Sequence, residues 1–352
     1  MKPDAERQLK FLQQIQQLFE DGNFTATYKF ALLMALAELA VEKGTDDTSE
    51  LVLDMCALAE KFAEFYWPQT LPYVSGTRGT EPSLLIQNKG RQAAVINALQ
   101  VARNKGAATL SQARCLPGWD NVIRQISRTV RDMPVKHLQY VGSTLVPFLY
   151  DMPLSGERLV LKDGVAAMLR AFHPLIQQLA RAGWVDHVRR NMRNARIIGR
   201  ADGLEDFMFG SQRKALLQAG EVLAKLQSHI CFYCSDRIRS AGDVDHFIPW
   251  VKYPRDLAHN FVLAHSECNR SKSDMLGAVR HLDRWLDRNR RYGASIDGEL
   301  TELGFLSDHS CSMSVARWAY EHAVSSGAYG WIKRKATEPL GRDCLELLAA
   351  PG

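Results

Sequence analysis

The pattern of apolar and polar positions predicts three helices at the start of the chain. Apolar residues recur every three or four positions between residues 2 and 21, which is the spacing of one helix face. Residues 25–41 are apolar on nearly all sides, and Gly44 is a stop signal after them. A third helical stretch begins at Asp47 and ends at Pro68. We expect these three helices to form the core of a helical domain.

The same pattern predicts further helices and few strands in the middle of the chain. Residues 84–103 are predicted to be helical, and residues 164–190 form a long helical pattern that Pro174 kinks or divides. Residues 146–150 and 158–163 are predicted to form a short strand pair. The 352 residues exceed one average domain, so we expect a mainly α protein of two or three packed units.

Neither membrane insertion nor export is expected from the sequence. The apolar run at residues 30–37 is too short to cross a bilayer, and Glu38 interrupts its continuation. Residues 1–10 are charged and lack the apolar core of a signal peptide. The sequence therefore predicts a cytoplasmic protein.

Two pairs of residues with equal spacing predict a zinc site. Cys231 and Cys234 are separated by two residues, and His265 and Cys268 repeat that spacing. Three thiolates and one imidazole can enclose one tetrahedral Zn²⁺, which would be structural because protein fills all four positions. The alternative is a set of ordinary buried cysteines and a surface histidine. His229 is a competing ligand, but it breaks the paired spacing.

A second motif lies between and beside the two pairs. Asp245 and His246 fall on a short predicted strand at residues 244–248, Asn260 follows in a loop, and Asn269 comes directly after the last cysteine of the zinc pairs. This order resembles the HNH, or ββα-metal, endonuclease family, whose pattern is a hairpin carrying Asp-His, a loop carrying Asn, and a helix opening with a metal-binding Asn or His. The resemblance covers about 45 residues.

The motif residues suit phosphodiester hydrolysis, which needs an activated water and a positive charge where negative charge develops. Histidine is a suitable general base because its ordinary pKa of about 6.5 leaves it largely neutral near pH 7. His246 is therefore the expected base. Asp245 and Asn269 offer only oxygen ligands, which favours catalytic Mg²⁺ or Mn²⁺. The resemblance implies that Asn260 shapes the hairpin and helps to orient the base. Lys272, one helical turn after Asn269, is expected to face the same phosphate or to be a solvated lysine.

The net charge of +5 is concentrated in one stretch. Residues 181–200 hold six arginines against one acid, Asp186, and so account for +5 by themselves. Guanidinium groups at helical spacing can follow a phosphate backbone, although charged runs are more often a solvated helix face. Beside a nuclease motif this stretch favours DNA as the partner. The arginines at helical spacing are Arg189, Arg193, Arg196 and Arg200.

Together these observations predict a mainly α protein of three parts. A large helical domain at residues 1–205, for DNA binding or regulation, precedes an embedded zinc-stapled ββα-metal (HNH) nuclease module at 210–278. A helical C-terminal segment at 279–352 packs back on them. The predicted function is metal-dependent endonuclease cleavage of DNA. The alternatives are a non-cleaving, zinc-dependent nucleic-acid-binding module and an RNase.

A single catalytic centre predicts nicking of one strand, so that cutting both strands would need a homodimer or a second binding event. Large helical proteins with one HNH centre also resemble nucleases of bacterial anti-phage defence, such as the nuclease component of Zorya type II systems. That resemblance implies partner proteins of a defence system. It rests on overall likeness, because no motif outside the HNH segment carries it.

Overall fold

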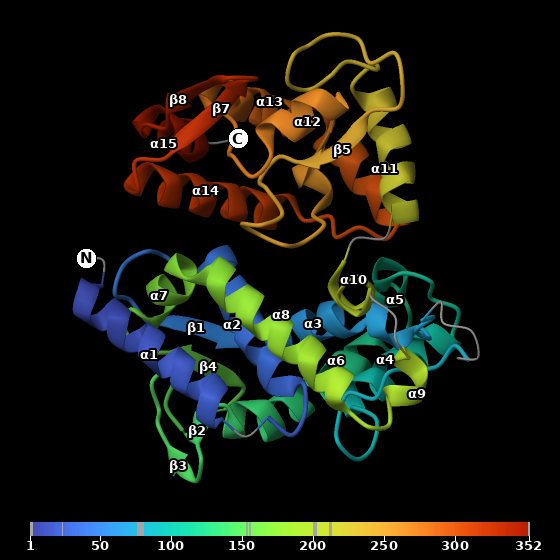
Figure 1. Cartoon of the computed structure of the whole chain (residues 1–352), viewed down its shortest axis with the longest axis vertical. Helices are drawn as coiled ribbons and strands as arrows, with labels where there is room; N and C mark the ends of the chain where they lie inside the picture. The colour runs from blue at the N-terminus through green and yellow to red at the C-terminus, as the bar shows by residue number, and fades with distance from the viewer. Residues whose placement is uncertain are drawn as a thin grey trace. The chain divides into compact units, whose positions relative to one another are not determined.

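The computed structural model describes residues 3–22, 24–75, 81–152, 154, 156–199, 203–210 and 213–350. The chain forms two compact units, Met1–Gly210 and Ser211–Gly352 (Figure 1). It is 57% helical, and the described residues contain fifteen α-helices and only two-stranded sheets. The prediction of a mainly α protein is therefore confirmed. No helix within the described ranges is long and apolar enough to cross a membrane.

The first unit is a helical domain with two small antiparallel strand pairs. Its α-helices are α1 (Ala5–Asp21), α2 (Tyr28–Lys43), α3 (Met55–Tyr66), α4 (Ala94–Asn104), α5 (Leu110–Arg114), α6 (Trp119–Val130), α7 (Val165–Ala171), α8 (His173–Arg190), α9 (Ala195–Ile198) and α10 (Leu204–Phe209). The remaining elements are β1 (Leu51–Asp54), the 3₁₀ helix η1 (Pro68–Thr70), the π-helical turn η2 (Arg131–Val135), β2 (Tyr140–Val141), β3 (Thr144–Leu145) and β4 (Arg158–Leu161).

Helix α2 is the centre of this unit. Every residue from Tyr28 to Val41 is buried, and α3, α7 and α8 pack around the helix. Such a helix has no polar face, because it is covered on all sides. Its one buried acid, Glu38, lies 3.1 Å from the ammonium of Lys61. The helices predicted for residues 2–21 and 25–41 are confirmed as α1 and α2, and Gly44 is the C-cap of α2.

Three other predictions about this unit need correction. The stretch from Asp47 is not all helix, because Leu51–Asp54 is strand β1, and α3 begins only at Met55. Strand β4 pairs with β1 (Leu51 opposite Leu161), whereas residues 146–150 contribute a single bridge from Tyr150 to Leu161. The helix predicted for residues 84–103 begins at Ala94.

The predicted break near Pro174 is confirmed, but the arginine run is not one helix. Helix α7 ends at Ala171 and α8 begins at His173, with Pro174 in its first turn, where the missing N–H costs least. Helix α8 then ends at Arg190. The side chain of Asn191 donates to Asn88 O (2.9 Å), and that of Asn194 accepts from Ile86 N (2.8 Å). These bonds replace the helical ladder with a turn.

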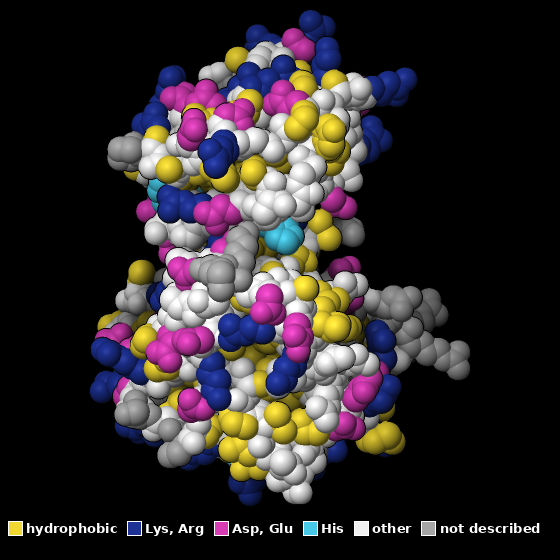
Figure 2. Space-filling model, turned by 90° about the vertical axis from the view of Figure 1, so that its left-hand side faces the viewer, with side chains coloured by type: hydrophobic (Ala, Val, Ile, Leu, Met, Phe, Trp, Pro, Cys, Tyr) yellow, Lys and Arg dark blue, Asp and Glu magenta, His cyan; other side chains and the backbone are white. Residues whose placement is uncertain are grey.

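The four arginines consequently have different surroundings. Arg189 is exposed at the end of α8, and Arg196 is exposed on α9. Arg193 lies in the turn between them and donates to the carbonyl of Gly90. Arg200 lies outside the described residues. On the face that Figure 2 shows, Lys and Arg side chains are interspersed with Asp and Glu over each unit.

The second unit contains the HNH-like segment and the helices after it. Its elements are α11 (Arg213–Leu226), β5 (Asp243–His246), the 3₁₀ helix η3 (Ala258–Asn260), β6 (Phe261–Ala264), α12 (Ser266–Lys272), α13 (Val279–Glu302), α14 (His309–Ser325), β7 (Tyr329–Lys333), β8 (Ala336–Pro339) and α15 (Arg342–Ala349). The predicted boundary between residues 278 and 279 falls inside this unit. Its core is therefore shared between the motif and the segment that follows it.

Candidate nuclease site

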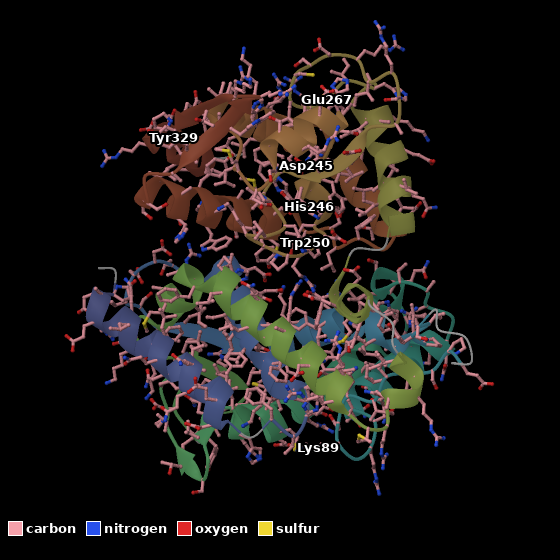
Figure 3. All side chains as sticks on the ribbon, in the orientation of Figure 1. Lys89, Asp245, His246, Trp250, Glu267 and Tyr329 are labelled. Atoms are coloured by element: carbon pink, nitrogen blue, oxygen red, sulfur yellow. The ribbon has the colours of Figure 1, made fainter. Side chains whose placement is uncertain are left out.

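The site is built on the hairpin of β5 and β6 and on helix α12, which covers one face of β5. The strands pair antiparallel, with Asp243 opposite Ala264 and His246 opposite Phe261. Successive side chains of a strand point to opposite faces. Asp243 and Asp245 accordingly face α12, and the imidazole of His246, at the end of β5, contacts Trp250, Asp256 and Phe261. Figure 3 shows Asp245, His246 and Trp250 following one another along this part of the second unit.

The four predicted zinc ligands lie together. One ligand atom from each of Cys231, Cys234, His265 and Cys268 lies within 4.8 Å of all the others. Cys231 and Cys234 come from the turn before β5, and His265 is the N-cap residue of α12. His229 is not part of the cluster. The four side chains therefore join the start of the hairpin to the start of the helix.

The donor set and its hydrogen bonds fit a Zn²⁺ ion. The Nδ1 atom of His265 lies 3.3 Å from Cys234 Sγ, while its Nε2 lies 3.4 Å from the carbonyl of Arg237. Because Nε2 donates to this carbonyl, Nδ1 is the ring nitrogen that can bind a metal. Burial and the two neighbouring thiols raise the pKa of Cys268 to about 12. Three thiolates at this spacing therefore need a cation, and a Cys₃His set is typical of structural zinc.

Asp245 is held by a residue of the zinc turn and by a residue of α12. The hydroxyl of Tyr233, which lies between the two cysteines of that turn, donates to Asp245 Oδ2 (2.5 Å). The ammonium of Lys272 lies 3.1 Å from the same oxygen and donates to the carbonyl of His246 (3.0 Å). Tyr233 is fully buried, and burial raises its pKa well above the usual range, so the hydroxyl stays a donor.

These contacts correct the role predicted for Lys272. Its side chain is 0% exposed, so it is neither a solvated lysine nor available to a DNA phosphate. Burial lowers the pKa of its ammonium, which Asp245 counteracts. A buried charge of this kind is tolerated because it is paired and hydrogen-bonded. Lys272 therefore fixes the conformation of β5 at the candidate catalytic residues.

Asn269 is oriented by a residue that the sequence did not single out. Its Nδ2 atom donates to Asp243 Oδ2 (3.3 Å), and Ser266 Oγ donates to Asp243 Oδ1 (2.8 Å). The acceptor carboxylate fixes which end of the amide is nitrogen. No hydrogen bond or ion pair among the described residues joins Asp245 to Asn269. Among the same described residues, neither Asp245 Oδ1 nor Asn269 Oδ1 accepts a hydrogen bond. Both atoms are therefore available as hard oxygen ligands.

His246 has a carboxylate partner on its own side of the hairpin. Its Nε2 lies 2.8 Å from Asp256 Oδ1, and its ring contacts those of Trp250 and Phe261 at centroid distances of 5.2 and 5.0 Å. An ionised carboxylate only accepts, so Nε2 carries the proton and Nδ1 remains basic. Asp256 lies ten residues from His246. No spacing rule in the sequence pointed to it.

Asn260 holds the chain directly after His246. Its side chain accepts from Ile248 N (2.7 Å) and donates to Ile248 O (2.9 Å), and its carbonyl accepts from Phe247 N (2.8 Å). It is 3% exposed. These two hydrogen bonds to the backbone of Ile248 close the turn that leaves β5, so the Asn260 side chain contacts backbone rather than the imidazole.

The helix after the motif buttresses the hairpin. Trp285 and Arg288 of α13 both donate to the carbonyl of His259, at 3.0 and 2.6 Å. Burial lowers the pKa of His259 to about 4, so it stays neutral within this cluster. His281 is fully buried, and its Nε2 lies 2.8 Å from the carbonyl of Ile332 in β7. Residues beyond the motif are therefore part of the framework of the site.

A hairpin and a helix joined by a Cys₃His cluster, with Asp-His on the hairpin and Asn on the helix, define a ββα-metal centre. The family model described as HNH endonuclease matches residues 231–275. A second model, described as Domain of unknown function (DUF8808), matches residues 8–204, which is more than half of the chain. The chain belongs to this second family and carries an HNH endonuclease domain. No curated protein and no solved structure matches it.

Proposed function

We propose that the protein is a metal-dependent endonuclease that hydrolyses DNA phosphodiester bonds at the hairpin of β5 and β6. The observation that carries the proposal is the arrangement of this hairpin. Asp245 and Asn269 keep unbonded oxygen atoms near the face covered by α12, and His246 presents a basic Nδ1 at the end of β5. A non-cleaving module would have no need to keep these three groups available.

Each side chain has a distinct role in the proposed reaction. Asp245 and Asn269 would hold Mg²⁺ or Mn²⁺, which supplies positive charge to the phosphate oxygens when it is bound. His246 removes the proton of the attacking water through Nδ1. Lys272 and Tyr233 hold the Asp245 carboxylate in place, and Asn260 sets the turn that presents His246. A preorganised centre of this kind reduces the cost of aligning water and phosphate.

DNA is proposed over RNA on the basis of the motif and of the exposed arginines near residue 190. A general base and a metal do not by themselves exclude a substrate with a 2′-OH. Parallel incubation of the purified protein with supercoiled plasmid and with RNA, with and without Mg²⁺ or Mn²⁺, tests the proposal. Cleavage of RNA alone would favour the RNase, and binding without cleavage would favour the non-cleaving module. The proposed setting in anti-phage defence rests on the resemblance described above.

One chain is expected to nick one strand of a duplex. The proposed centre has one base and one pair of metal ligands, so cleavage of both strands requires two binding events or a dimer. On supercoiled plasmid, open-circle DNA should accumulate before linear DNA, as resolved on an agarose gel over time. Linear DNA appearing at once, from a species that light scattering shows to be monomeric, would mean that a second centre exists.

Replacing Asp256 by asparagine should lower kcat by about ten- to a hundredfold and leave KM within a few-fold, because the carboxylate orients the imidazole without touching the phosphate. The histidine ¹⁵N spectrum should also change, since an amide oxygen holds the Nε2 proton less firmly than a carboxylate. Asp283→Asn, at an exposed position of α13 in the same unit, is the matched control. Unchanged kcat and an unchanged ¹⁵N spectrum would show that the Asp256 contact has no part in catalysis.

A further inference from the structure

The first unit contains a cavity that the nuclease chemistry does not use. It has a volume of about 330 Å³ and is lined by the chain before α2, the first turn of α2, the turn η2 and strand β2. This volume is near the lower end of the range for small-molecule pockets, about 300 to 1,000 Å³. The cavity therefore suits a ligand about the size of a mononucleotide.

A buried lysine that has no ion-pair partner among the described residues lines this cavity. Lys29 is only 8% exposed, and the described part of the chain offers its ammonium no carboxylate and no hydrogen-bond acceptor. The ammonium lies against the ring of Phe24, whose centroid is 5.4 Å from Nζ. Burial lowers the pKa of Lys29. An unpaired ammonium is costly to bury, so the position favours an anion that none of the described residues provides.

The start of α2 adds a second positive element to the same cavity. Thr27 is the N-cap residue, but its hydroxyl bonds the Tyr66 hydroxyl (2.6 Å) instead of capping the helix. The first backbone bond of the helix runs from Ala31 N to Thr27 O, and no described acceptor meets the N–H groups of the three residues before Ala31. A helix N-terminus with several unbonded N–H groups attracts phosphate oxygens.

The rim of the cavity is aromatic. Tyr140 and His137 line it, with ring centroids 6.1 Å apart and ring planes tilted by 43°. His137 follows the π-helical turn Arg131–Val135, which contains Pro134 and departs from ordinary helix geometry. Such turns are frequent at functional sites. Aromatic rings beside an anion site can stack on a nucleobase.

We propose that this cavity binds a nucleotide phosphate, with the Lys29 ammonium and the N-terminus of α2 holding the phosphate and with Tyr140 and His137 against the base. The site is independent of the proposed cleavage, because it lies in the first unit and shares no residue with the HNH segment. The same chemistry is available from a free mononucleotide and from the phosphorylated end of a nucleic-acid strand.

The test is calorimetric titration of the full-length protein, without added divalent ions. The probes are inorganic phosphate, the four ribonucleoside 5′-monophosphates, and a short DNA strand with and without a 5′-phosphate. At least one nucleotide-bearing probe should bind, and phosphate alone should bind more weakly. Binding of the 5′-phosphorylated strand but not of monophosphates would identify a strand end as the source, and the reverse would identify a free nucleotide.

Lys29→Met should weaken the binding by about ten- to a hundredfold, as expected for loss of a charged hydrogen bond. Its melting temperature should not fall, because methionine keeps the length of the side chain and removes an unpaired charge. Lys136→Met is the matched control. Lys136 is exposed and directly precedes His137, which lines the cavity. Its ammonium pairs with Asp132 at 3.0 Å. Failure of every probe to bind, or equal affinity of the Lys29→Met and wild-type proteins, would overturn the proposal.

Discussion

The His246→Ala variant is expected to lose nearly all cleavage while keeping its fold and its zinc. A positioned general base contributes about 10²- to 10⁴-fold, and the structure shows no second histidine placed to replace it among the described residues of the hairpin. His246 and Asp256 are both partly exposed, at 15% and 20% of their side chains, so water can solvate the carboxylate that remains. The cost to stability should therefore be small.

The measurement is the initial rate of plasmid nicking with Mg²⁺, beside the melting curve and the zinc content of each variant. His229→Ala is the matched control. His229 is exposed in the same unit. Alanine at this position has to adopt the same backbone conformation, with φ near 57°. The control should nick at the wild-type rate. If His246→Ala retained activity within a few-fold of wild type, another group would have to be the base.

Sequence patterns predicted those parts of the fold that local forces determine. Helix α2 was predictable because a stretch that is apolar on all sides can only be a covered helix. Strand β1 was missed because its partner β4 lies more than a hundred residues later, and four residues carry no periodic signal of their own. The predicted helical stretch ended at residue 190, as α8 does, but the helical spacing assigned to the arginines after it was wrong for a similar reason. Asn191 and Asn194 leave the helix to bond residues near position 87, and that loop is distant in sequence.

The candidate site divides in the same way. The zinc ligands and the motif residues were predicted from their spacing, because residues a few positions apart are brought together by local backbone turns. Spacing gives the direction of a side chain but not its depth. Lys272 was placed on the correct side of α12, towards the site, yet its side chain is fully buried and pairs with Asp245. Asp256, Asp243 and Tyr233 were not singled out, since only the folded hairpin brings them to His246, Asn269 and Asp245.

Loss of a zinc ligand is expected to have the largest effect on stability. Structural zinc can contribute on the order of 10 kcal/mol to the folding of a small module, and the Cys268→Ser variant loses one of three thiolates. The second unit should then unfold at a much lower temperature, while the first unit, which has its own core around α2, keeps its helices. Elemental analysis should find about one zinc per wild-type chain and far less in the variant.

Two further variants separate metal binding from packing. Cys344→Ser makes the same chemical change at a buried thiol of the second unit that lies outside the cluster, so zinc should remain and stability should fall by only about 1–3 kcal/mol. His265→Cys keeps four ligands in a set that zinc also accepts, and it should retain the metal. If His265→Cys lost zinc while Cys268→Ser kept it, the assignment of ligands would be wrong.

Zinc loss should also remove activity although Asp245, His246 and Asn269 remain in the chain. Tyr233 lies between Cys231 and Cys234, and its hydroxyl fixes the Asp245 carboxylate, so a disordered zinc turn releases that carboxylate. At the other end of the hairpin, His265 anchors the start of the helix that carries Asn269. Removal of zinc by a chelator, followed by excess Mg²⁺, should therefore not restore nicking, whereas added Zn²⁺ with Mg²⁺ should. A zinc-free protein that is folded and cleaves at the wild-type rate would show that the cluster neither supports the hairpin nor positions its residues.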